Sequence, residues 1–150
     1  MSQSLSKLYI HLIFSTKGRQ PLIPRGTQSD LHSYMAGIFI RNESPAIIIN
    51  SVPDHLHVLF RLSKNMALAG VVEQVKKSTS KWMKERTGSS SFFWQRGYGA
   101  FSVSSSKVDL VARYIARQEE HHKHMGYREE IERFMKEYDV IEYNTDYFWN

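Results

Sequence analysis

Cysteine is absent from the 150 residues of this chain, which excludes disulfide bonds, thiolate metal sites and cysteine nucleophiles. The absence fits a reducing compartment. No apolar run approaches the roughly 20 residues that a membrane-spanning helix needs. The polar start and the short apolar stretch 8–14 lack the form of a signal peptide. We therefore expect a cytoplasmic protein with no membrane partner.

Positive charge is in excess. The chain has 20 Lys and Arg against 15 Asp and Glu, a formal net charge of +5, and its pI is near 9.5. A basic balance favours a polyanionic partner, of which nucleic acid is the commonest. The apolar fraction of 41% and the length predict one globular domain over residues 1–150, with 127–150 as a C-terminal tail.

The apolar patterns predict the order strand, helix, strand, strand, helix, strand. The segments are residues 8–14, a helix from a Thr27–Asp30 capping box to before Pro45, residues 46–49, a strand from residue 55, a helix from residue 68 to Gly88, and residues 92–103. With right-handed crossovers this order gives an α+β, ferredoxin-like fold, an antiparallel sheet with helices on one face. The first and third strands are then central, and the other face is free for a substrate.

Two histidines stand in the third strand. His55 and His57 follow a turn at Pro53 and Asp54, and the residues around them are apolar. Because a strand has a period of two, both imidazoles point to one face. Two imidazoles on one rigid element can share a metal ion. The alternative, which is commoner for an isolated His-x-His, is that they are hydrogen-bonded histidines at a sheet surface.

A further helix follows the sheet. We expect a flexible link at Ser104–Ser106 and a capping box formed by Ser106 and Asp109. Tyr114 and Gln118 then stand at i and i+4 on one side of the helix. A tyrosine at such a position is more often a packing residue than a nucleophile.

The end of this helix has a structural interpretation. Gly126 is predicted to end it as a left-handed residue. The histidines of the run 121–124 then lie where cations interact well with the helix macrodipole, and we prefer this role to a second metal site. Residues 128–150 predict a short charged helix and aromatic residues that dock on the domain or bind a partner.

Basic residues gather in the loop after the first strand, on one helix and in the stretch 92–103. The helix from residue 68 carries Lys76, Lys77, Lys81, Lys84 and Arg86 on its polar side. They form either a solvated face or a track for a phosphate backbone. In the stretch 92–103, aromatic residues alternate with Arg96, which suits base stacking beside phosphate contacts, although part of these rings must fill the core. Candidate DNA contacts are Lys17, Arg19, Lys76, Lys77, Lys81 and Arg96.

Taken together, four motifs resemble those of the single-tyrosine HUH transposases, the IS200-like insertion-sequence enzymes and their REP-associated relatives, where HUH denotes two histidines around a bulky apolar residue. The matching segments, in order, are Tyr9–Lys17 with Arg19–Ile23, Val52–His57, Phe93–Tyr98, and Tyr114–Gln118. Each motif is loose, but their order along most of the chain is specific.

The resemblance implies a set of roles. His55, His57 and Gln118 would bind a divalent metal, Mg²⁺ or Mn²⁺. Tyr114 would attack a DNA phosphorus and leave a 5′-phosphotyrosine and a free 3′-hydroxyl. The substrate would be single-stranded DNA folded into hairpins at element ends, on chromosomal DNA of a bacterial or archaeal type cell. The enzyme would be a homodimer whose tyrosine helix acts in trans, for which Ser104–Ser106 supplies flexibility.

Two other functions stay open. A DNA-hairpin binding protein would keep the fold without cutting, and a metal-dependent phosphodiesterase would use water and would not need Tyr114. The tail after Gly126 is longer than in the smallest insertion-sequence enzymes. The chain could therefore be a domesticated relative that no longer moves an element.

Overall fold

A four-stranded antiparallel sheet organises the chain in a computed structural model that describes residues 2–138. The elements, in order, are β1 (Leu8–Ser15), η1 (Lys17–Arg19), η2 (Arg25–Thr27), α1 (Gln28–Arg41), β2 (Ala46–Val52), β3 (His55–Leu62), α2 (Leu68–Thr87), β4 (Gly99–Val103), η3 (Ser105–Lys107), α3 (Val108–Ala116), α4 (Gln118–His121) and α5 (Tyr127–Glu137). The strand order is β2-β3-β1-β4. This confirms the predicted α+β fold, with the first and third strands at the centre.

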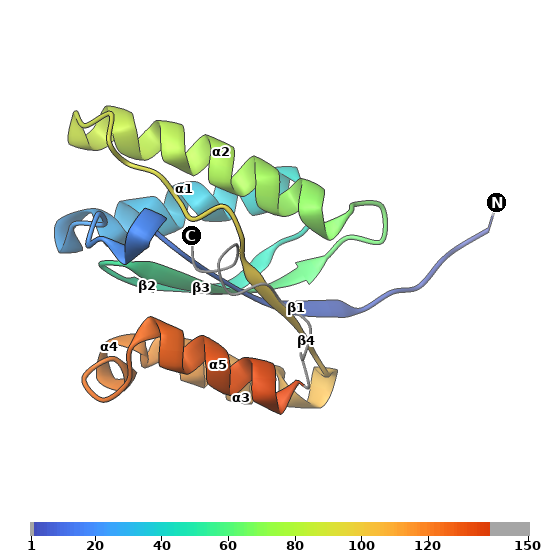
Figure 1. Cartoon of the computed structure of the whole chain (residues 1–150). Coiled ribbons are helices and arrows are strands. Elements are labelled where there is room, and N and C mark those ends of the chain that lie inside the picture. Colours follow the sequence, from blue (N-terminus) through green and yellow to red (C-terminus); the bar gives the residue numbers. More distant parts are fainter. Residues whose placement is uncertain (1, 139–150) are drawn as a thin grey trace.

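The main core lies between the sheet and the helices α1 and α2. Leu12 and Phe14 of β1 and Leu56, Val58 and Phe60 of β3 point to this side and are buried. They meet the apolar sides of α1 and α2, which both cover this face (Figure 1). The period of two along each strand thus selects the even-numbered residues for this core.

The opposite face of the sheet is covered, not free as we predicted. Helices α3, α4 and α5 lie across it (Figure 1). Ile13 and Phe101 from the sheet pack against Tyr127, Ile131 and Met135 of α5. The prediction was wrong because residues 127–137 were interpreted as a charged tail. Its apolar residues recur at helical spacing and bury one side of α5.

The predicted helix starts differ from those observed. Thr27 and the residues before α3 make no side-chain capping bond. A capping residue needs an extended backbone to aim its oxygen at the first turn, but Thr27 is already helical because it ends the 3₁₀ turn η2. Ser106 likewise lies inside η3, so the segment that we expected to be a flexible link is a 3₁₀ turn closed from Lys107 N to Ser104 O at 2.9 Å.

The helix with the tyrosine ends earlier than predicted. Its last residue is Ala116, because Arg117 has a non-helical backbone (φ −102°, ψ 25°), and α4 begins at Gln118. Asn50 of β2 supports this break, since its Nδ2 donates to the carbonyls of Ile115 at 2.8 Å and Ala116 at 3.3 Å. Gly126 is extended (φ −78°) and precedes α5, so its predicted role as a left-handed helix end is wrong.

The last strand is shorter than predicted. Only Gly99–Val103 pair with β1, while Trp94 forms an isolated bridge with Thr16. Lys76 Nζ donates to the carbonyls of Gln95, Arg96 and Gly97, which turns the chain between the two pairings. Among the residues that the structure describes, no helix is both long and apolar enough to cross a membrane. The aromatic residues of 143–149 lie outside the described range.

Candidate active site

His55 and His57 lie side by side on the covered face of the sheet. Both side chains are completely buried, and their ring centroids are 5.5 Å apart. The register of β3 against β1 pairs His57 with Ile13 and His55 with Ser15, which fixes both in the middle of the layered structure. Their common face, as predicted from the strand period, is the face that α3–α5 cover.

Glu130 of α5 and His122, in the turn after α4, complete a cluster with them. Glu130 of α5 places Oε1 2.9 Å from His57 Nε2 and 3.4 Å from both His55 Nε2 and His122 Nε2. The Nε2 atoms of His55 and His122 are 2.9 Å apart. The four ligand atoms all lie within 4.8 Å of one another. We call His55, His57, His122 and Glu130 the His-Glu cluster.

Tyr114 and Gln118 both reach this cluster. The Tyr114 hydroxyl donates a short hydrogen bond to Glu130 Oε2, the oxygen that does not contact the histidines. Gln118 is buried, and its Oε1 lies 3.0 Å from His122 Nε2. Its Nε2 atom is buried without a hydrogen-bond partner in the described part of the chain. The structure therefore brings together the four predicted site residues His55, His57, Tyr114 and Gln118.

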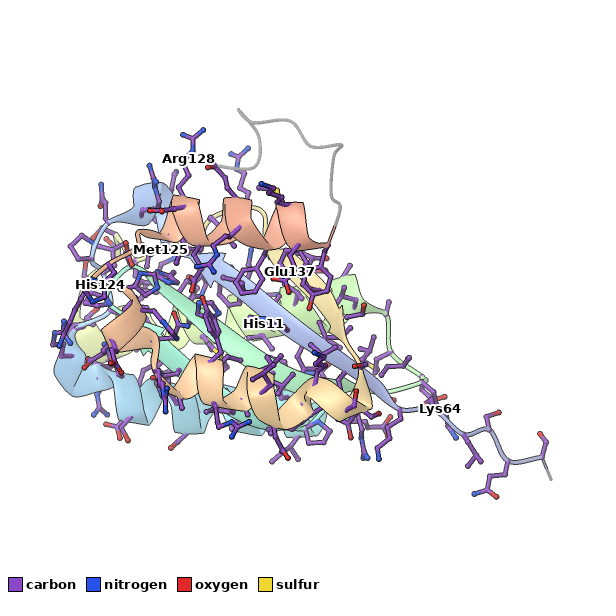
Figure 2. The ribbon with its side chains drawn as sticks, turned by 90° about the horizontal axis from the view of Figure 1, so that it is seen from below. His11, Lys64, His124, Met125, Arg128 and Glu137 are labelled. Atoms are coloured by element: carbon purple, nitrogen blue, oxygen red, sulfur yellow. The ribbon has the colours of Figure 1, made fainter. Side chains whose placement is uncertain are left out.

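Each strand histidine has a partner on its Nδ1 atom. Asp54 Oδ1 lies 2.8 Å from His55 Nδ1, and His11 Nε2 lies 2.8 Å from His57 Nδ1. Figure 2 shows His11 above the sheet, between α3 and α5. These contacts turn the Nε2 atom of each strand histidine toward the cluster, which is the arrangement that metal-binding histidines commonly have.

Burial and neighbouring charges shift the pKa values of the buried groups in and beside the cluster. Burial disfavours the Glu130 carboxylate, but hydrogen bonds from His122, His55 and His57 outweigh it and hold the pKa of Glu130 far below its ordinary value. Burial also opposes protonation of His55, but Asp54 and Glu130 outweigh it and raise its pKa. Burial lowers the pKa of His57 to about 4 and that of His11 to about 3. Without an ion, the cluster therefore holds a carboxylate and neutral His57, while the raised pKa of His55 favours its protonated form.

Tyr114 is a weak acid in this environment. Burial raises its pKa above the ordinary value, and the negative charge of Glu130 raises it further. A phenol in that state is a poor nucleophile. The group that accepts its hydrogen bond, Glu130, is an ionised carboxylate that holds the hydroxyl in place, and its low pKa makes it too weak a base to take the proton.

The donor set fits a divalent cation. Three imidazole nitrogens and one carboxylate oxygen converge, with Gln118 Oε1 beside them. Donor atoms bound about 2.1 Å from one ion lie about 3.0–3.4 Å apart in tetrahedral or octahedral geometry. Most of the separations in the cluster, 2.9 to 3.4 Å, match this spacing.

Sequence reasoning missed three members of the site. His122 was assigned to the helix macrodipole, Glu130 was part of a charged tail, and His11 was counted as a strand residue. A usable pattern existed for Glu130. Tyr127, Glu130 and Ile131 stand at i, i+3 and i+4, which places the carboxylate on the buried side of α5.

The predicted DNA contacts lie at different depths. Lys76 is half-buried, and its ammonium donates to three backbone carbonyls. Burial lowers its pKa to about 8. Lys17, Arg19, Lys77, Lys81 and Arg96 are exposed.

Two cavities flank the cluster. One of about 540 Å³ is lined by Arg19, Arg25, Asp54, His122 and Tyr127, among others. The other, of about 240 Å³, is lined by His11, Tyr114, Glu130, Arg133 and Phe134, among others. The buried cluster can thus be approached from two sides.

Comparisons with known proteins bear on the family and the fold of the chain. The family model described as "Transposase IS200 like" matches residues 4–118, a range that includes all four motifs. The crystal structure of a transposase candidate from Deinococcus radiodurans R1 is similar, with a TM-score of 0.62 and 20% identity over 79% of this chain and 98% of that one. The structure of a REP-associated tyrosine transposase bound to a REP hairpin has a TM-score of 0.58 and 14% identity, over 81% and 74%. No curated protein sequence matches significantly.

Proposed function

Because this chain belongs to the family of IS200-like transposases, as its motifs predicted, we propose that it cleaves and rejoins single-stranded DNA through a 5′-phosphotyrosine. The observation that carries the proposal is the hydrogen bond from Tyr114 to Glu130, because the same carboxylate contacts His57. A nucleophile, the carboxylate that positions it and a set of metal ligands thus meet at one point.

Cleavage transfers the DNA phosphorus from the 3′-oxygen to the oxygen of Tyr114. The Tyr114 oxygen, held by its hydrogen bond to Glu130, attacks the phosphorus in line with the 3′-oxygen and loses its proton to water. The bond between phosphorus and the 3′-oxygen breaks, and the leaving oxygen takes a proton from water. The product is a 5′-phosphotyrosine and a free 3′-hydroxyl. Attack by a 3′-hydroxyl reverses the step, so strands are rejoined without another energy source.

A divalent metal would be held by His55, His57 and His122 with Glu130, and Gln118 stands close enough to add its amide oxygen. When bound, the ion neutralises charge that develops on the phosphate oxygens. A set with three imidazoles suits Mn²⁺ better than Mg²⁺, which prefers oxygen ligands. We therefore propose Mn²⁺ as the better cofactor of the two.

We place the reaction within one chain. Tyr114 bonds Glu130 of its own chain, and Glu130 contacts His57, because the turn η3 and helix α3 follow β4 closely across the sheet. A homodimer that exchanges its tyrosine helices stays a prediction, which the mixing experiment in the Discussion tests.

The proposed substrate is single-stranded DNA that carries a hairpin. A REP-associated tyrosine transposase with a similar fold is bound to a REP hairpin in its structure, which supports this choice. Exposed Lys17, Arg19, Lys77, Lys81 and Arg96 are the proposed phosphate contacts. We leave Lys76 out of this set, because its ammonium is occupied by backbone carbonyls.

A covalent-adduct assay tests the function. The full chain is incubated with Mn²⁺ and a pool of labelled single-stranded oligonucleotides of randomised sequence, and the adduct is sought after SDS denaturation. We expect an adduct that Tyr114→Phe abolishes while DNA binding persists. Binding without cleavage would favour the hairpin-binding alternative. Cleavage without an adduct would favour the water-dependent phosphodiesterase.

A further inference from the structure

Phe93 is an exposed aromatic ring on a rigid support. Its exposed fraction is 46%, whereas its neighbours Phe92 and Trp94 are 2% and 8% exposed and pack in the core. The Phe93 carbonyl accepts a hydrogen bond from Lys17 N at 2.8 Å, and Trp94 Nε1 donates to Thr79 Oγ1 at 3.0 Å. The backbone on both sides of the ring is therefore held in place, and the side chain points out of the domain.

Cations surround this ring. Lys84 Nζ lies 4.1 Å and Lys17 Nζ 5.7 Å from its centroid. Lys77 and Lys81 stand seven and three residues before Lys84 on α2, so the three lysines share one side of the helix. Within residues 2–138, none of these four lysines forms an ion pair with a carboxylate, whereas Arg86 at the end of the same helix is paired with Asp30. In the described residues, their charges are therefore not neutralised by a carboxylate.

The ring stands at the same end of the sheet as His55. Thr16 N donates to Asp54 O at 2.9 Å, and Thr16 also bridges to Trp94, next to Phe93. The turn η1 then places Lys17 at the ring, while Arg19, two residues on, lines the larger cavity beside His122. In Figure 1 the loop after α2 and the turn between β2 and β3 lie at the same end of the molecule.

We propose that Phe93 is a stacking platform for an unpaired base of single-stranded DNA, with Lys17 and the lysine side of α2 holding the adjacent phosphates. The proposal rests on the proposed function and adds to it the path of the DNA strand, which runs from the His-Glu cluster over η1. The chemistry selects this ligand. An aromatic face can stack with any base, and lysines without an ion pair can bind phosphates. Duplex DNA offers no free base face to a single exposed ring.

Equilibrium binding in EDTA tests the platform without cleavage. The probes are fluorescein-labelled dT20 and a 20-base-pair duplex, measured by anisotropy with the full chain. Phe93→Ala should weaken dT20 binding about 5- to 100-fold and leave duplex binding unchanged. Phe93→Trp should retain dT20 binding, and its added fluorescence should be quenched by dT20. Ile40→Ala, which removes an apolar side chain of 66% exposure on α1, is the matched control and should change neither affinity.

The lysines give a second readout. Lys84→Ala should reduce the slope of log affinity against log salt by about 0.7 for dT20, whereas Lys107→Ala, on exposed η3, should not.

Equal dT20 affinity of Phe93→Ala and the unmodified chain would overturn the platform. If the covalent adduct still formed in that case, the proposed function would stand. If the unmodified chain bound neither probe and formed no adduct, both proposals would fail.

Discussion

The Nε2 atom of His11 lies 2.8 Å from the Nδ1 atom of His57. Both rings are buried, and both have pKa values far below the ordinary value, so neither carries a proton beyond the neutral form at pH 7. One nitrogen of this pair must therefore donate and the other accept. If His57 donates from Nδ1, its Nε2 lone pair is directed at the His-Glu cluster, as metal binding requires.

His11 should therefore be a positioning residue for His57. We expect His11→Ala to weaken Mn²⁺ binding about 10- to 100-fold, because the Nδ1 proton of His57 loses its acceptor. His11→Gln, whose amide oxygen can accept the same bond, should restore most of the affinity. Calorimetric titration with Mn²⁺ measures both. His32→Ala is the control, since His32 bonds Ser51 instead. Equal losses of Mn²⁺ affinity in His11→Ala and His11→Gln would argue against a role of His11 as the acceptor of the His57 Nδ1 proton.

Glu130 should be a metal ligand as well as the acceptor for Tyr114. Glu130→Gln keeps the shape but removes the charge, so the affinity for Mn²⁺ should fall at least about tenfold, and the increase in Tm on adding Mn²⁺ should shrink. Glu129→Gln changes an exposed neighbour on the same helix and should have no effect. An unchanged Mn²⁺ affinity in Glu130→Gln would restrict the carboxylate to its contact with Tyr114.

Subunit mixing distinguishes assembly within one chain from exchange. Tyr114→Phe and His57→Ala proteins are combined under conditions in which dimers would exchange. With Tyr114 at the histidines of its own chain, each protein keeps its own defect and the mixture forms no adduct. Recovery of the adduct would instead establish that the tyrosine of one chain serves the histidines of another.

The metal-free protein should lose stability as the pH falls below about 6.5. His11 and His57 stay neutral in the folded state down to about pH 3 and 4, whereas the unfolded chain protonates them near pH 6.5. The unfolded state then binds up to two more protons, and the free energy of unfolding drops by at most about 1.4 kcal/mol per pH unit for each.

His55 acts in the other direction and in another pH range. Its raised pKa gives stability below pH 6.5 that is lost as the pH rises. Urea unfolding in EDTA should therefore give a free energy of unfolding with a maximum near pH 6.5. In His11→Gln this free energy should fall less steeply as the pH drops below 6.5. Stability that is constant from pH 7.5 to 5.0 would contradict neutral, buried His11 and His57.

The sequence predicted what depends on local periodicity. The alternation around His55 and His57 gave their common face, and the order of strands gave the sheet. It did not predict contacts made across the sheet by distant segments. Glu130 is 73 residues from His57, and nothing local to a charged helix indicates which sheet face it covers. The break at Arg117 was missed for the same reason, because Asn50 of β2 supports it.

The pairing of Ser15 with His55 and of Ile13 with His57 also bears on how the chain finds its fold. If β3 slipped by one residue against β1, both histidines would turn into the apolar layer under α1 and α2, and Leu56 and Val58 would face Glu130. Such an arrangement leaves two buried imidazoles without their partners and removes two of the contacts of the buried Glu130 carboxylate, at a cost of several kcal/mol. Misregistered arrangements are thereby penalised, so the residues proposed for DNA cleavage also favour the native alignment of the two strands.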